Sequence, residues 1–152
     1  MERIVSLARI VTDALFGRGV GERLRPLSLS PLPVVVFSLG LRLPTPRVYG
    51  EVKPHDFGPE LPVSEILEAL EKGEEPPYWN SLEAPAFRLH PELRQVKARL
   101  LDLGLRGVLM TGSGSAFFGL AESEDHARKV AGALRHSGYA RHGILGGGYG
   151  VI

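Results

Sequence analysis

Apolar and polar positions along the chain follow two periods, one typical of helices and one typical of buried strands. Residues 33–37 are β-branched or aromatic after a proline and carry no charge, which predicts a buried strand. Residues 21–29 predict an edge strand, because Pro26 lacks the N–H that an inner strand needs. Helical spacing predicts helices over 4–15, 62–70, 91–103 and 123–134, with a further one from about 80 to 90. A final strand is expected over 139–145.

The middle of the chain holds two short apolar runs, residues 108–110 and 116–120, on either side of a small-residue stretch. Each run is bounded by glycine and suits a strand, so the two should pair as an antiparallel hairpin. The connecting residues are Thr111, Gly112, Ser113, Gly114 and Ser115. Their amides and hydroxyls would form a concave set of donors for an anion, whereas the structural alternative is a solvated hairpin loop. No Gly-Lys-Ser/Thr follows, so this is not a nucleotide P-loop.

The order of the predicted elements is helix, two strands, several helices, a strand hairpin, a helix and a strand. This order predicts an α+β fold, an antiparallel sheet with helices on one face. The later part has ferredoxin-like connectivity with extra helices inserted. A length of 152 residues suits one domain.

The composition of the chain excludes several classes of binding partner. The net charge is +1, so we expect no nucleic-acid partner. No apolar run reaches the ~20 residues that span a bilayer, so no membrane partner is expected. The chain has no cysteine and no signal-peptide pattern, in keeping with the cytoplasmic location we expect. The five histidines lack the spacing of a metal pair and the acidic run over 68–75 is typical of a solvated face, so we expect no metal site.

Four other positions are candidates for chemistry, each with a structural alternative. Thr45 would cap a short helix with Pro46 at its first position, and Tyr49 would lie one turn further on the same side. Asn80 is a good cap for the helix that follows it. Asp13, judged by position alone, is an exposed polar residue.

Three of these segments resemble a known family. Residues 107–119, Gly-Val-Leu-Met-Thr-Gly-Ser-Gly-Ser-Ala-Phe-Phe-Gly, resemble the third motif of the galactokinase, homoserine kinase, mevalonate kinase and phosphomevalonate kinase superfamily. Residues 43–49, Leu-Pro-Thr-Pro-Arg-Val-Tyr, and 79–83, Trp-Asn-Ser-Leu-Glu, narrow the resemblance to the 4-diphosphocytidyl-2-C-methyl-D-erythritol kinases. The resemblance divides the chain into a divergent N-terminal helix (1–16), a C-terminal substrate-side kinase domain (17–147) and a flexible tail (148–152).

The resemblance implies an enzyme of non-mevalonate isoprenoid biosynthesis. Such kinases use ATP and Mg²⁺ to phosphorylate the 2-hydroxyl of a methylerythritol linked to cytidine diphosphate. By matched position, the loop from Thr111 to Ser115 would support the phosphate region. Thr45 would contact the substrate, Tyr49 would stack on cytosine, and Asn80 would lie near the cleft. Asp13 would match the catalytic aspartate after a deletion.

The sequence also departs from the family. It contains neither a Pro-x-Ala-Lys-x-Asn segment nor a Gly-x-Gly-Leu-Gly-Gly-Gly-Ser-Ser phosphate loop. We therefore expect a fragment, a truncated gene product or an incomplete gene that binds no cofactor tightly and is inactive alone. The face left by the missing half would favour self-association. The alternatives are a non-catalytic nucleotide- or phosphate-binding module and a structural interaction domain.

Overall fold

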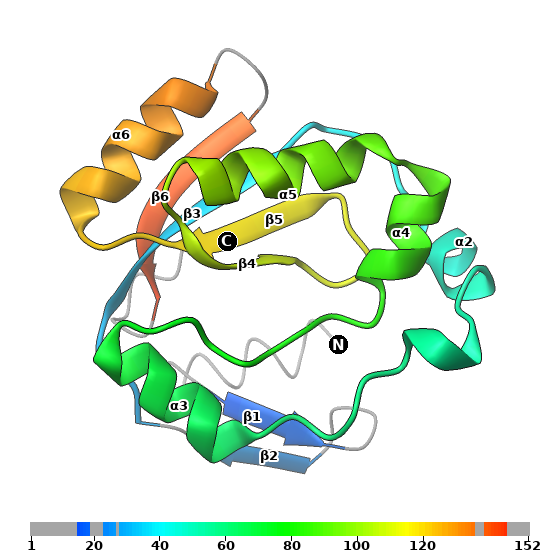
Figure 1. The fold of residues 1–152 in the computed structure, drawn as a ribbon, viewed down its shortest axis with the longest axis horizontal. Helices are drawn as coiled ribbons and strands as arrows, with labels where there is room; N and C mark the ends of the chain where they lie inside the picture. The colour runs from blue at the N-terminus through cyan, green and yellow to red at the C-terminus, as the bar shows by residue number, and fades with distance from the viewer. Residues whose placement is uncertain (1–14, 19–22, 27, 136–138, 146–152) are drawn as a thin grey trace.

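The computed structural model describes residues 15–18, 23–26, 28–135 and 139–145 of the chain (Figure 1). The predicted helix over 4–15, with Asp13, lies outside these residues except at its last position. There the prediction is wrong, because Leu15 begins a strand, β1 (Leu15–Arg18). This strand pairs antiparallel with β2 (Arg23–Pro26), which confirms the strand predicted around Pro26. The predicted tail over 148–152 also lies outside the described residues.

The principal sheet has four antiparallel strands in the order β4-β5-β3-β6. They are β3 (Leu32–Ser38), β4 (Arg106–Met110), β5 (Ala116–Leu120) and β6 (Tyr139–Leu145). All four lie where the sequence predicted strands, and β4 and β5 form the expected hairpin. Helical stretches lead from β3 to β4 and from β5 to β6, and neither of these strand pairs is adjacent in the sheet. The topology is therefore ferredoxin-like, as predicted.

In the described part of the chain, six helical segments accompany the sheets. They are α2 (Thr45–Gly50), the 3₁₀ turn η1 (Pro54–Asp56), α3 (Val63–Lys72), α4 (Glu83–Leu89), α5 (Glu92–Asp102) and α6 (Glu124–Leu134). Two predicted helix-end signals are confirmed, one at the end of α3 and one at the start of α6. Gly73 ends α3 in the left-handed conformation, and the hydroxyl of Ser123 accepts the N–H of His126 at the start of α6.

The core lies between the sheet and the two helices α5 and α6, which share one face of it (Figure 1). Val35, Phe37 and Phe117 point into this core. Val34 and Leu120, which alternate to the opposite face of the sheet, are buried as well. Phe117 and Leu93 are fully buried there. The apolar stripe of α6 is buried as its helical spacing predicted: Ala127, Val130, Ala131 and Leu134.

An extended segment before α4 covers the outer edge of β4. The hydroxyl of Tyr78 donates to the carbonyl of Gly107 at 2.6 Å, and both carboxylate oxygens of Glu75 accept the Gly107 N–H at 3.0 Å. Gly107 has φ +54°, and a Cβ there would lie 2.3 Å from the Tyr78 hydroxyl. The N–H and the carbonyl of Gly107 at this sheet edge are therefore satisfied within the chain rather than left for another strand.

Candidate functional site

A side-chain hydrogen bond joins the two segments that the sequence singled out. Thr45 Oγ1 and Ser113 Oγ lie 2.8 Å apart, so the start of α2 touches the loop between β4 and β5. The prediction that Thr45 caps α2 is wrong: Pro44 occupies the cap position and no side chain caps the helix. The threonine hydroxyl is directed to the loop instead, which sequence spacing cannot reveal because the partner is 68 residues away.

The glycine loop (Thr111 to Ser115) is shaped by its own hydrogen bonds. The Thr111 N–H donates to the Ala116 carbonyl at 2.8 Å, and the Gly114 N–H donates to the Thr111 carbonyl at 3.0 Å. The hydroxyl of Thr111 donates to Ala116, and that of Ser115, almost fully buried, donates to the Leu41 carbonyl at 2.8 Å. Several groups that would have faced an anion are thus engaged within the protein.

The two loop glycines have different surroundings. Both have positive φ, +53° at Gly112 and +96° at Gly114. A Cβ on Gly114 would lie 2.8 Å from Leu43 Cδ2 and 2.9 Å from Met110 Sδ, so glycine is needed there for packing. A Cβ on Gly112 would meet no atom within 4 Å. Gly112 and Ser113 therefore form the part of the loop that a ligand is able to approach.

Asn80 holds the loop from the α4 side. Its Nδ2 donates to the carbonyls of Met110 at 2.8 Å and Gly112 at 2.7 Å, and its Oδ1 accepts the N–H of Leu82 at 2.9 Å. The prediction that Asn80 caps the next helix is wrong, because α4 begins later and Leu82 is at its cap position. The amide needs both of its donors for the loop, and only its oxygen serves the local turn.

Sequence reasoning missed a second support for the loop. Glu83, the first residue of α4, accepts the Met110 N–H through Oε1 at 2.7 Å and pairs with Lys97 Nζ through Oε2 at 2.6 Å. A glutamate in the first helical turn is explained by the helix dipole alone, so the pattern carries no signal for this role. The backbone of Met110 is therefore held at its carbonyl by Asn80 and at its N–H by Glu83.

Tyr49 is presented to the outside of α2. Its side chain is 60% exposed, whereas its neighbour Val48 is fully buried. Trp79 is half-buried, and its indole packs against Gly58. A Cβ added to Gly58 would lie only 2.0 Å from the indole Nε1. The indole thus covers the backbone of the loop after η1, which matches the structural interpretation of a lone tryptophan.

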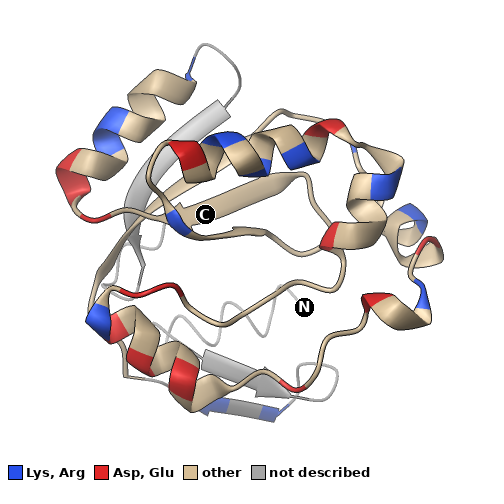
Figure 2. Ribbon diagram, viewed as in Figure 1, with Lys and Arg blue, Asp and Glu red and all other residues tan. Residues whose placement is uncertain are grey.

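Charged residues lie beside the glycine loop rather than in it: Glu83, which binds the Met110 N–H, pairs with Lys97. The loop itself contains no charged residue. In Figure 2, acidic residues gather on α3 and basic residues lie along α5. Among the described residues, no group of three or more His, Asp or Glu is placed to hold a metal ion. Within the same ranges, no helix has the length and apolar character needed to cross a membrane.

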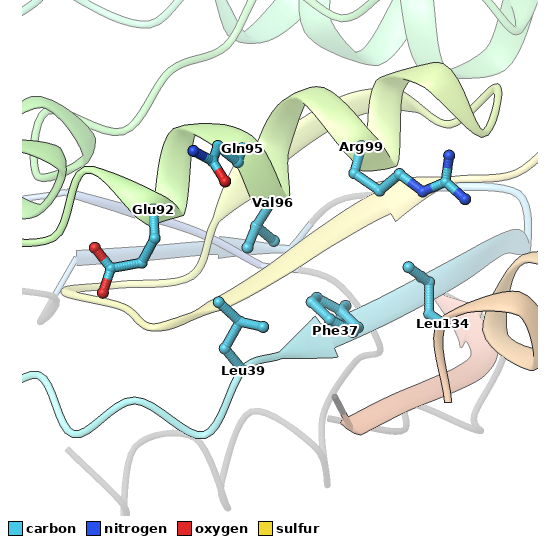
Figure 3. Close-up of a pocket in the computed structure, with 7 residues that line it drawn as sticks. All are labelled: Phe37, Leu39, Glu92, Gln95, Val96, Arg99 and Leu134. Carbon is cyan, nitrogen blue, oxygen red and sulfur yellow. The ribbon is translucent and has the colours of Figure 1, made fainter. Parts of the chain in front are cut away.

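A separate hollow of about 220 Å³ lies between α5, the end of β3 and the end of α6. Figure 3 shows Phe37, Val96 and Leu134 directed into it, with Glu92 and Arg99 along the side formed by α5. It contains none of the residues that the sequence proposed for the site. The hollow and the glycine loop are therefore two distinct features of the molecule.

Comparison with known proteins decides the family. Residues 63–140 match the family described as "GHMP kinases C terminal". The chain belongs to this family. It is also a homologue of the 4-diphosphocytidyl-2-C-methyl-D-erythritol kinases: it is 70% identical over 131 residues to the one from Thermus thermophilus, a match that covers 86% of this chain and 48% of the relative.

Solved structures agree with this assignment to the GHMP kinase C-terminal family. A crystal structure of 4-(cytidine 5'-diphospho)-2C-methyl-D-erythritol kinase, 68% identical, superposes with a TM-score of 0.84 and covers 88% of this chain and 50% of that one. Homoserine kinase from Cytophaga hutchinsonii, at 15% identity and a TM-score of 0.65 over 96% of this chain and 53% of that one, shares the fold. The chain spans about half the length of the curated relatives it matches.

Proposed function

We propose that this chain forms the substrate-side part of a cytoplasmic kinase that phosphorylates the 2-hydroxyl of 4-diphosphocytidyl-2-C-methyl-D-erythritol, a step of isoprenoid precursor biosynthesis. The observation that carries the proposal is the hydrogen bond between Thr45 and Ser113. It brings the proposed substrate segment and the proposed phosphate-region loop to one place. The 70% identity to the Thermus thermophilus kinase supports the choice of substrate. We assign residues 17–147 to this kinase domain.

Each residue of the site has a proposed role that its geometry allows. The exposed ring of Tyr49 offers a face on which a cytosine ring stacks, an interaction that requires no base-specific hydrogen bond. We propose that the hydroxyls of Thr45 and Ser113, which are 2.8 Å apart, bind substrate oxygens. Gly112 lets the phosphate region approach the backbone, since no side chain occupies the space beside it. Asn80 holds the loop in this shape.

The family's ATP and Mg²⁺ fit this chain only in part. ATP supplies the phosphoryl group, and transfer depends on positioning and on neutralising the charge of the γ-phosphate. The described residues offer no cluster of carboxylates to hold Mg²⁺. The glycine loop also has no lysine or arginine to neutralise phosphate charge. We therefore propose that the 152 residues alone bind ATP weakly and do not turn over. We propose Asp13 as the catalytic aspartate of the completed site.

The test is reconstitution in trans. The chain is mixed with the separately produced N-terminal half of the Thermus thermophilus relative, and ADP formation is measured with the cytidine-linked substrate. We expect turnover in the mixture and none in either part. In the mixture, Tyr49→Ala should raise KM for the substrate, whereas Leu101→Ala, which shortens an exposed side chain on α5, should not.

The outcomes separate the alternatives. A mixture without turnover in which the chain still binds cytidine nucleotides through Tyr49 would favour a non-catalytic binding module. A mixture with neither turnover nor nucleotide binding would favour a structural interaction domain. Turnover by the chain alone would contradict the proposal that it lacks a working phosphate site.

A further inference from the structure

The position of the Tyr49 ring depends on the backbone that carries it. The ring is 60% exposed, so contacts with neighbouring side chains do little to fix it. The helix α2 has six residues, too few to be stable without tertiary contacts. Its start is held through Thr45, and its middle by the fully buried Val48, which shares the core with Ala86 of α4. The end of the helix, next to Tyr49, needs a restraint of its own.

Arg88 of α4 supplies that restraint. Its Nη2 donates to the carbonyl of Glu51, the residue that caps α2, at 2.6 Å. The same guanidinium forms a two-pronged pair with Asp56 of η1, from Nη1 to Oδ1 at 3.0 Å and from Nη2 to Oδ2 at 2.6 Å. One side chain thus connects the end of α2, the 3₁₀ turn and α4.

The pair is built to stay in one geometry. The Asp56 side chain is only 2% exposed and that of Arg88 is 27% exposed. Asp56 Oδ2 also accepts the Lys53 N–H at 2.7 Å, so the carboxylate closes the turn that leads into η1. The hydrogen bonds from Arg88 hold the pKa of Asp56 well below its ordinary value, so the carboxylate is charged at neutral pH. A planar guanidinium fork opposite a carboxylate fixes direction as well as distance.

We infer that Arg88 and Asp56 form a positioning pair that holds the Tyr49 end of α2 where the ring accepts a cytosine face. The inference rests on the proposed function, because the role of the ring is part of that proposal. Neither residue touches the nucleotide; both act through the Glu51 carbonyl and the turn after it. The pair therefore governs how well the tyrosine is presented, and its effect requires the tyrosine to be present.

The test measures cytidine 5′-diphosphate binding to the full chain by calorimetry in a mutant cycle. Arg88→Lys keeps the positive charge but loses the two guanidinium N–H groups that donate to Asp56. Asp56→Asn keeps the shape of the side chain but loses its negative charge. We expect each to weaken binding about three- to tenfold when Tyr49 is present and not to change it in a Tyr49→Ala background. The matched control is Arg94→Lys on α5, whose guanidinium lies 5.7 Å from the Phe87 ring centroid. It should leave affinity unchanged.

A second measurement does not need the ligand. The Glu51 and Val52 amides donate to the carbonyls of Val48 and Tyr49 at the end of α2. Their hydrogen exchange should become faster in Arg88→Lys and stay the same in Arg94→Lys. Unchanged exchange in Arg88→Lys, or equal losses of affinity with and without the Tyr49 ring, would overturn the inference. If Tyr49→Ala itself left affinity for the nucleotide intact, the proposed function would fall, and the functional part of the inference with it.

Discussion

Replacing Asn80 by aspartate separates its two roles with almost no change of shape. The variant keeps the oxygen that accepts the Leu82 N–H and loses the amide that donates to Met110 and Gly112. A carboxylate would then face two carbonyl oxygens at less than 3 Å. Two lost hydrogen bonds at about 1 kcal/mol each, together with this repulsion, predict a loss of about 2 to 3 kcal/mol of unfolding free energy at pH 7.

The sign of the pH dependence gives a sharper test. Facing two carbonyls, the introduced carboxyl has a folded-state pKa above its ordinary value of about 3.9. The native state then binds more protons than the unfolded state between the two pKa values, so the penalty is present at high pH and shrinks as pH falls. Protonation also restores one donor to the loop. The difference between variant and parent should therefore become smaller from pH 7 towards pH 4.

The assay is urea unfolding followed by the fluorescence of Trp79, the single tryptophan of the chain. The control is Gln95→Glu, the same amide-to-carboxyl change on the exposed side of α5, which should stay within about 0.5 kcal/mol of the parent. If Asn80→Asp were as stable as the control at pH 7, Asn80 would not be holding the glycine loop.

Three further predictions follow from contacts elsewhere in the structure. Gly107→Ala should destabilise the chain by about 3 kcal/mol in urea unfolding, because its Cβ would lie 2.3 Å from the Tyr78 hydroxyl at positive φ, whereas Gly132→Ala, in open space on α6, should be neutral or slightly stabilising. Arg88 lowers the pKa of the Asp56 carboxyl in the folded state. The stabilisation from this pair is therefore fully present above pH 3.8, the ordinary pKa, and is lost as the pH falls below that value. Asp56→Asn should reduce the loss of stability on acidification. Light scattering at rising concentration should show self-association through exposed apolar side chains, and a monomer throughout would contradict that expectation.

The local pattern of the sequence was sufficient to predict most of the fold. Apolar periodicity placed the strands of the principal sheet, and the Ser123 cap and Gly73 stop placed helix ends, because these signals act within a few residues. The same reasoning was wrong at Leu15, where apolar residues at helical spacing end in a strand. Pairing with Pro26 outweighed local preference there, and pairing is a property of two segments.

The sequence indicated which residues to consider for the candidate site, but not how they are arranged. Thr45 and Asn80 are residue types that favour helix caps, and by local rules both were assigned that role. In the structure their side chains bond partners 68 and about 30 residues away, so tertiary contacts displaced the caps. Glu83 and Arg88 gave no signal, because their partners include backbone groups, which any sequence supplies.

Nuclear magnetic resonance of the ¹⁵N-labelled chain titrated with cytidine 5′-diphosphate tests most directly whether α2 and the glycine loop form one wall of a substrate site. The account predicts that the largest shifts fall on amides of residues 45–50 and 111–115 together, and that Tyr49→Ala removes them. Shifts confined to the hollow of Phe37, Val96 and Leu134, with none in those two segments, would contradict it.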